Sequence, residues 1–219
     1  MIKIENLNKK FNTTVVLKDI NLHIKKGETI VLKGVSGSGK TTLLSLIGGL
    51  DRPNRGTLFI DSEPIHKLPD RFASKLRASK IGMVFQHFNL LEHLSVAENV
   101  MIPLIPNSMK IDEIKKRVDK ILHLAQIEHK RNNLASRLSG GEKQRTAIAR
   151  ALIANPKILL CDEPTANLDR ENSLIFIQTL QELSSQGKTI VIATHDPLFD
   201  DLEFVDRVLP MVDGEIIEE

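Results

Sequence analysis

A short apolar run that leads through a glycine-rich loop into a helical stretch is the feature that most constrains how this chain folds. The run Thr29–Lys33 is typical of a buried strand, and Thr41–Ile47 is typical of a helix. Between them, residues Gly34 to Thr41 read G-V-S-G-S-G-K-T, which matches the pattern G-x-x-x-x-G-K-[ST]. Glycines let the backbone N–H groups of such a loop turn inward around phosphate oxygens. The chain is therefore predicted to be an α/β protein with a phosphate-binding loop.

Each part of this loop has an expected role toward a nucleoside triphosphate. Lys40 supplies a cation for the β and γ phosphates, and the hydroxyl of Thr41 is a ligand for Mg²⁺. The start of the following helix adds a partial positive charge. The residues expected to hold the nucleotide are Gly34, Ser36, Gly37, Ser38, Gly39, Lys40, Thr41 and Thr42.

Other apolar segments predict the rest of the α/β fold. Ile158–Cys161 and Thr189–Ala193 are near-continuous apolar runs, as expected of parallel strands that are covered on both faces. Helical stretches alternate with these runs, which favours an α/β architecture. Shorter strand-like runs occupy the first part of the chain at Ile2–Leu7, Ile20–Ile24 and Thr57–Ile60.

The middle of the chain is expected to be helical. Ser95-Val96-Ala97-Glu98 is a capping-box pattern that begins one helix. Asp112–Ala125 places apolar residues on one helical face. We therefore predict one domain over residues 1–219, in which a helical subdomain of about residues 87–137 is inserted into the α/β core.

Two carboxylates follow the apolar run Ile158–Cys161. A charge at the end of a buried strand is costly unless a ligand or reaction requires it. Beside a phosphate loop, Asp162 is expected to hold the Mg²⁺ shell and Glu163 to polarise the attacking water as a general base. The structural alternative is that these residues only cap the loop before Pro164.

The segment Ser139-Gly140-Gly141-Glu142 also has two interpretations. Ser-x-x-Glu is a capping box, and the residues that follow continue as a helix. Two adjacent glycines are unfavourable in a helix but useful where a backbone approaches a phosphate closely. Because one phosphate site already exists at the glycine loop, a second anion site suggests that the γ-phosphate of another subunit docks here.

Four single residues are weaker candidates. Gln86 follows a predicted strand and would reach Mg²⁺ or the attacking water, or else have only a structural role at the strand end. His195 would contact the γ-phosphate and orient Glu163, or else cap the next helix. Asp169 would bridge two subunits or cap the helix that begins near Arg170. Phe11, in a turn rich in Lys and Asn ahead of the strands, would stack on adenine or be an ordinary core or surface residue.

Composition excludes several classes of protein. The net charge is +2 and all eight aromatic residues are Phe, so a nucleic-acid-binding surface with stacking aromatics is not expected. The single cysteine, Cys161, cannot form a disulfide framework. The longest apolar run, Leu43–Leu50, is much shorter than the roughly 20 residues that a membrane-spanning helix needs. Any role at a membrane is therefore expected to depend on a partner.

Taken in this order along the chain, the motifs resemble those of the nucleotide-binding subunit of ATP-binding cassette (ABC) transporters. The resemblance implies a P-loop NTPase core of the RecA type, an N-terminal antiparallel β subdomain and an inserted α-helical subdomain. It also implies ATPase activity in a head-to-tail homodimer that holds two Mg-ATP. Each ATP would lie between Lys40 of one subunit and Ser139 of the other. Gln86, Asp169 and His195 would complete the site, with Gln86 and His195 in the catalytic set.

A finer resemblance lies in the segments Gly48–Pro53 and Phe85–Leu91, which are similar to the branch that serves lipoprotein release and macrolide efflux. This branch implies an integral membrane permease as partner and a location on the cytoplasmic face of the cell membrane, with the residues near Phe88 helping to form the docking cleft. The sequence departs from the usual pattern at Phe11, where Tyr is more common, and at Glu92, where Pro is common.

Two other functions remain open at this point. One is a cassette ATPase that acts in DNA repair, translation or cofactor assembly. Most such proteins carry a long coiled coil, zinc-binding cysteines or a second cassette, and this sequence shows none of these. The other is a P-loop kinase, which would leave the segment Ser139–Glu142 and His195 without a role.

Overall fold

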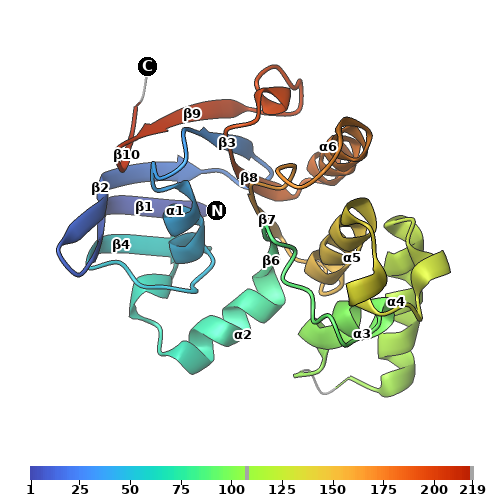
Figure 1. Ribbon diagram of the computed structural model, residues 1–219. Coiled ribbons are helices and arrows are strands. Elements are labelled where there is room, and N and C mark those ends of the chain that lie inside the picture. The colour runs from blue at the N-terminus through green and yellow to red at the C-terminus, as the bar shows by residue number, and fades with distance from the viewer. Residues whose placement is uncertain (107–108, 218–219) are drawn as a thin grey trace.

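The computed structural model describes residues 1–106 and 109–217. Its centre is a six-stranded sheet with the order β10-β9-β3-β8-β7-β6 (Figure 1). The strands β3, β6, β7, β8 and β9 run parallel, and β10 pairs antiparallel with β9. The bounds are β3 Thr29–Lys33, β6 Ile81–Val84, β7 Ile158–Asp162, β8 Thr189–Thr194, β9 Arg207–Val212 and β10 Glu215–Ile216. The predicted parallel core is therefore confirmed.

A second sheet of four antiparallel strands has the order β2-β1-β4-β5 and confirms the predicted N-terminal β subdomain. Its strands are β1 Ile2–Phe11, β2 Thr14–Ile24, β4 Arg55–Ile60 and β5 Glu63–Pro64. Helix α1, Lys40–Ile47, lies between this sheet and one face of the central sheet, where its leucines join a shared core. The phosphate loop is therefore followed by a helix that packs between the two sheets.

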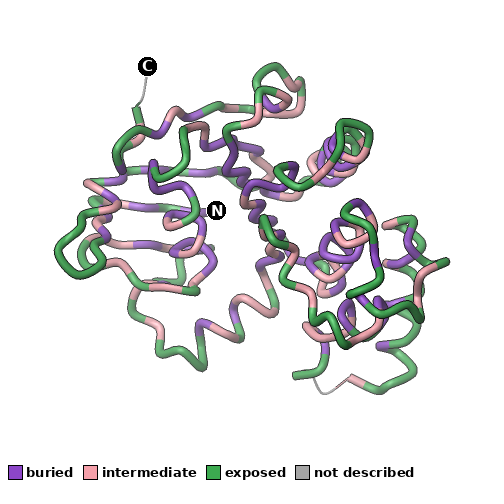
Figure 2. Tube along the Cα trace, in the orientation of Figure 1, coloured by how far each residue is buried: buried purple, intermediate pink, exposed green. Residues whose placement is uncertain are grey.

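The alternation of side chains along the central strands divides the core into two layers. Ile30 and Leu32 pack toward α1, whereas Val31 packs on the opposite face. That opposite face is covered by α5, Gly140–Leu152, and by α6, Arg170–Ser185. Figure 2 shows the buried residues concentrated along these central strands and on the inner faces of the helices. Burial on both faces explains why the strands read as unbroken apolar runs.

The helical part of the molecule contains α3, Val96–Met101, and α4, Ile111–Leu124, which pack with α5 around a third core. The capping box at Ser95 and Glu98 is present and begins α3. Four short 3₁₀ turns lie at Ile65–Lys67, Ile102–Leu104, Glu128–Lys130 and Ala135–Arg137, and a fifth, η5, lies at Pro197–Phe199. In Figure 1 this helical part lies on the side of β6 and β7 that is away from the antiparallel sheet.

Three features differ from the sequence predictions. Helix α2, Asp70–Lys80, and strand β9 were not predicted, because α2 is strongly polar and β9 contains Pro210. Phe11 is the last residue of β1 and pairs with Thr14, so it does not lie in a turn ahead of the strands. The strand extends this far because its register shifts, rather than ends, between Ile4 and Lys10. Within residues 1–106 and 109–217, the helices are all too short or too polar to cross a bilayer.

Candidate functional site

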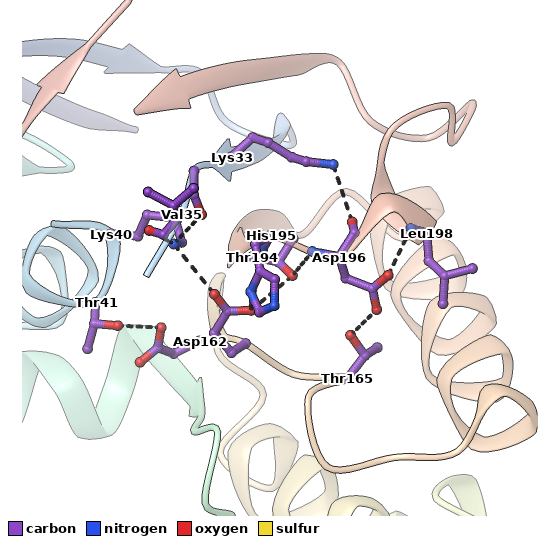
Figure 3. Close-up of polar contacts among 12 residues, drawn as sticks. Lys33, Val35, Lys40, Thr41, Asp162, Thr165, Thr194, His195, Asp196 and Leu198 are labelled. Atoms are coloured by element: carbon purple, nitrogen blue, oxygen red, sulfur yellow. Dashed lines mark hydrogen bonds and ion pairs between the residues drawn. The ribbon is translucent and has the colours of Figure 1, made fainter. Parts of the chain in front are cut away.

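The candidate site lies where three neighbouring parallel strands end. Strand β8 pairs with β3 on one side and with β7 on the other, so their carboxyl ends lie at one edge of the sheet. The phosphate loop follows β3, Asp162 ends β7, and Thr194 ends β8. This edge is where open α/β sheets bind their ligands. Figure 3 shows Lys40, Thr41, Asp162 and His195 gathered there from segments far apart in the sequence.

The backbone of the phosphate loop requires glycine at specific positions. Gly37 and Gly39 have φ angles of 84° and 101°, a region that disfavours other residues. A Cβ on Gly34 would stand 2.3 Å from the carbonyl oxygen of Met211, so the loop lies directly against β9. Ser36 and Gly37 are exposed at the tip of the loop, and the hydroxyl of Ser38 is buried without a hydrogen-bond partner among the described residues.

The ammonium of Lys40 is held inside the loop. Its Nζ donates to the carbonyl oxygens of Gly34 and Val35 at 2.7 and 3.0 Å, and it lies 3.5 Å from Oε1 of Glu163. The Lys40 side chain is only 5% exposed. The structure therefore brings the predicted cation and the predicted base into one ion pair at the sheet edge.

Thr41 and Asp162, each expected from the sequence to contact Mg²⁺, are in direct contact with one another. The Thr41 hydroxyl donates to Oδ1 of Asp162 at 2.9 Å. Burial raises the pKa of Asp162 and the neighbouring charge of Glu163 adds to this, whereas the Thr41 hydrogen bond and Lys40 oppose it. A hydroxyl and a carboxylate oxygen in contact are the kind of ligands that Mg²⁺ prefers, so the residues present fit this ion.

Glu163 is fixed by three donors from the end of β8 and the residue after it. Its Oε2 accepts from the Thr194 hydroxyl at 3.1 Å and from the His195 backbone at 3.4 Å, and lies 3.0 Å from His195 Nδ1. Glu163 itself has a φ of 42°, an uncommon backbone conformation for this residue type. Of the two sequence alternatives for His195, the structure shows the contact with Glu163, whereas Asp196 caps the short helix that follows.

Sequence reasoning missed Thr194 and the anchoring of the loop after it. Thr194 is fully buried at the end of an apolar strand, and a threonine in a strand gives no signal in the sequence. Asp196 accepts from the Thr165 hydroxyl at 2.6 Å and from the Leu198 backbone at 3.0 Å. Lys33, the residue before the phosphate loop, forms an ion pair with Asp200 (Figure 3 shows Lys33 reaching toward this loop).

Gln86 is exposed just beyond the end of β6. The backbone carbonyl oxygen of Gln86 accepts from the Asn167 side chain at 2.7 Å, which ties this residue to the loop after Glu163. Phe88 and Asn89, immediately beyond, both have positive φ angles, and their carbonyl oxygens accept from the guanidinium of Arg150 in α5.

The segment Ser139–Glu142 forms the predicted capping box at the start of α5. Ser139 and Gly140 are exposed. Gly141 is buried, and a Cβ there would stand 2.3 Å from Oδ1 of Asn172, so a side chain at this position would have to displace the Asn172 side chain of α6. In Figure 1, α5 and α1 lie apart, with β6 and β7 between them, and the described contacts join neither Ser139 nor Gly140 to the phosphate loop of the same copy.

The two remaining candidates have clear local contacts. Asp169 caps α6, because its side chain accepts from the backbone N–H of Asn172 at 2.8 Å. Phe11 is 49% exposed, and the ammonium of Lys9 lies 4.6 Å from the centroid of its ring. One ring face is therefore occupied by a cation that Asp51 also holds, at 2.7 Å.

Comparison with known protein families identifies the family of this chain. A family model described as ABC transporter matches residues 17–166, which is more than half of the chain. The chain belongs to the ABC transporter family. The phosphate loop, the capping box at Ser139 and the carboxylate pair all fall within the matched span.

Known ABC proteins match this cassette along its whole length. It is 40% identical over 219 residues to the macrolide export ATP-binding/permease protein MacB of Campylobacter jejuni, and covers 34% of that relative. The cassette therefore spans about a third of the length of the MacB proteins it matches. It is 41% identical to the lipoprotein-releasing system ATP-binding protein LolD of Bacteroides thetaiotaomicron, with 99% of both chains covered.

A solved structure agrees with the fold and with the enzyme class. The dimeric ATP-binding cassette MJ0796, in a post-hydrolysis state bound to ADP and Pi, superposes with a TM-score of 0.91 at 41% identity. The match covers 100% of this chain and 97% of that structure. The corresponding protein of Methanocaldococcus jannaschii is described as an uncharacterized ABC transporter ATP-binding protein. The chain is thus an ATP-binding cassette of the ABC ATPase class.

Proposed function

We propose that two copies of this cassette close head-to-tail around two Mg-ATP, hydrolyse them, and thereby drive an integral membrane permease. The observation that carries the proposal is the cluster at the sheet edge, where Lys40, Asp162 and Glu163 meet within hydrogen-bonding or ion-pairing distance of Thr41 and His195. This cluster contains a phosphate-binding cation, ligands for a divalent cation, and an oriented base.

Each residue has a distinct task in hydrolysis. Lys40 leaves its ion pair with Glu163 to bind the β and γ phosphates, which frees the carboxylate to accept a proton from the attacking water. Thr194 and His195 keep that carboxylate at the end of β7 and β8. Mg²⁺, when held by Thr41 and Asp162, would neutralise charge on the phosphates. Gln86 stands beyond β6, where its side chain would complete the metal and water contacts.

The second copy supplies the remaining contacts in this proposal. Ser139 and Gly140 are exposed at the N-terminus of α5, which favours an anion through its free N–H groups and dipole. Within one copy this helix end is separate from the phosphate loop, so a two-fold symmetric pair would place it against the partner's γ-phosphate. The similar cassette MJ0796 has a dimeric solved structure, which supports a pairing of two copies.

The Glu163→Gln variant tests the dimer and the base together. We expect ATP binding to persist, hydrolysis to fall about 100-fold or more because the base is lost, and ATP-bound dimer to accumulate. Size-exclusion chromatography with light scattering measures the dimer, and phosphate release measures turnover. Glu182→Gln, an exposed site on α6, is the matched control. Wild-type turnover in Glu163→Gln would remove Glu163 as the base.

The permease contact is assigned to the residues from Phe88 to Leu91. They lie between the catalytic edge and the helical part, and Arg150 holds the backbone carbonyls of Phe88 and Asn89. The similarity to MacB and LolD supports an export or lipoprotein-release system on the cytoplasmic face of the membrane. A homodimer bound to such a permease would have no direct nucleic-acid partner.

Capture of the partner distinguishes the branches. Tagged Glu163→Gln protein would be pulled from ATP-treated, detergent-solubilised native membranes, and its partners identified by mass spectrometry. A four-helix permease with a large extracytoplasmic domain supports the exporter branch. Recovery of a different permease would support a transporter function but contradict the assignment to the exporter branch. Only partners from repair, translation or cofactor assembly, with membranes demonstrably extracted, would favour the alternative function.

A further inference from the structure

The carboxylate of Glu142 lies directly beside the exposed Ser139 at the start of α5. Its Oε2 accepts from the backbone N–H of Ser139 at 2.8 Å, and its own N–H donates to the Ser139 hydroxyl at 3.3 Å. Hydrogen bonding from Ser139 and the ion pair with Lys130 lower the pKa of Glu142, with burial opposing them, so the group is ionised at neutral pH. A full negative charge therefore stands next to the surface proposed to receive a phosphate.

This charge has a dedicated partner from another part of the molecule. The Nζ of Lys130 lies 3.0 Å from Oε1 of Glu142, and the two side chains are 33% and 14% exposed. Lys130 ends the short 3₁₀ turn η3, Glu128–Lys130, in the helical part. The next residue, Arg131, forms an ion pair with Asp119 of α4, and its carbonyl accepts from the N–H of Ala97 at 3.0 Å. Lys130 is thus presented from an anchored turn.

The ion pair is not needed for helix capping. A capping box works equally with a neutral Gln at the third position, so the cap alone does not explain why a largely covered carboxylate is paired with a lysine. The effect of Glu142 on phosphate binding, unlike its effect on capping, depends on its charge. A largely covered negative charge is weakly screened and repels any phosphate that approaches Ser139. A cation within 3.0 Å cancels most of that repulsion.

We infer that Lys130 is a positioning residue of the inter-subunit phosphate site, whose ion pair neutralises Glu142 and so permits ATP-driven closure of the dimer. This inference rests on the proposed head-to-tail dimer. It assigns to the helical part a direct electrostatic role in closure. It predicts that Lys130 is required only while residue 142 carries a charge.

The test is a cycle of variants made in the Glu163→Gln protein, which holds ATP without turnover. Lys130→Met, Glu142→Gln and the double variant are compared by the protein concentration that gives half-maximal dimer in saturating Mg-ATP, measured by light scattering. Lys116→Met, which removes an exposed lysine of α4, controls for net charge. Binding of a fluorescent ATP analogue to the monomer and thermal melting are measured for every variant.

We expect Lys130→Met to weaken dimerisation about tenfold, the scale of one unfavourable contact between partly covered charges, with monomer nucleotide binding unchanged. Glu142→Gln is expected to dimerise at least as well as the parent, and the double variant to recover to within about twofold of it. A pair that only stabilises the fold would also show rescue, so the discriminating result is weaker dimerisation of Lys130→Met at a temperature where thermal melting shows it to be folded. The inference is overturned if Lys130→Met matches Lys116→Met, or if the double variant stays as weak as Lys130→Met.

The cycle also separates this inference from the function on which it depends. If the Glu163→Gln parent forms no dimer with ATP, the proposed inter-subunit site itself fails. If Lys130→Met has a melting temperature too low for the dimerisation assay, Lys130→Gln is used in its place. It is then compared with and without Glu142→Gln in the same way. Raised salt provides a second measurement. Because Glu142 is largely covered, the difference between Lys130→Met and the parent should persist at raised salt, whereas a difference caused by exposed surface charge would be screened.

Discussion

Replacing Thr194 by Val would remove the hydroxyl that holds the catalytic carboxylate while leaving the shape of β8 nearly unchanged. Thr194 is fully buried, donates to Oε2 of Glu163 at 3.1 Å, and accepts from the backbone N–H of Asp196 at 3.0 Å. Valine keeps the branched Cβ that suits a strand. The substitution therefore acts on two hydrogen bonds at the site.

The expected loss follows from these two bonds. A buried hydrogen bond to a charged group contributes about 2 kcal/mol and a neutral one about 1 kcal/mol, and the added methyl returns roughly 1 kcal/mol of apolar burial. We therefore expect Thr194→Val to lower the free energy of unfolding by about 2 kcal/mol. Because Oε2 of Glu163 then keeps only its two contacts with His195, we also expect kcat to fall about tenfold.

A matched control exists at the other end of the same strand. Thr189 is also fully buried, and its hydroxyl accepts from the backbone N–H of Gly27 at 2.9 Å, far from the carboxylates. By the same arithmetic the lost neutral bond of about 1 kcal/mol is offset by the added methyl, so Thr189→Val should leave both the free energy of urea unfolding and kcat nearly unchanged. If Thr194→Val unfolds within about 0.5 kcal/mol of wild type and keeps its kcat, Thr194 does not hold Glu163 in the way argued here.

Three further predictions use other parts of the structure. Phe11→Ala should weaken ATP binding about tenfold by calorimetry if the open ring face stacks on adenine, with Phe11→Tyr unchanged; equal affinities would remove the stacking role. The raised pKa of Asp162 means that the folded state holds its proton where the unfolded chain has lost it. The contribution of Asp162 to stability is therefore lost as pH rises through its raised pKa. The affinity for Mg²⁺ should weaken as pH falls from about 7 toward this pKa, because the protonated carboxyl is a poorer ligand. Asp162→Asn should abolish this pH dependence of Mg²⁺ affinity. Gly56→Ala should cost about 3 kcal/mol or more in unfolding, because φ is 87° and the new Cβ would stand 2.4 Å from the Asn6 carbonyl; Gly187→Ala, with φ of 77° and open space, should cost only about 1 kcal/mol.

Local patterns were enough to predict the parts of the fold that depend on neighbouring residues. The loop from Gly34 to Thr41, the parallel strands β7 and β8, and the capping boxes at Ser95 and Ser139 follow from composition and spacing over a few positions. Tertiary packing determined the rest. Helix α2 is polar, and buries only Ala73 and Leu76, so its sequence carries little periodic signal.

The candidate site shows the same division. Asp162 and Glu163 were identifiable because charges at the end of an apolar strand are unusual. Thr194 was not, because a threonine inside a strand is ordinary, and only the pairing of β7 with β8 reveals which carboxylate it serves. Gly141 was assigned to phosphate approach from its place beside Gly140, whereas its contact with Asn172 depends on how α6 crosses α5.

The order of strands in the central sheet has a consequence for synthesis of the protein. Strand β3, which carries the phosphate loop, has β8 and β9 as its two neighbours, and both come from residues 189–212. While the chain is being made, β3 therefore has no sheet partner on either side until this segment has been translated. Glu163 likewise gains Thr194 and His195 only then. An unfinished chain would contain every residue of the phosphate loop but could not hold the loop in place, so nucleotide binding is delayed until nearly the whole cassette can fold.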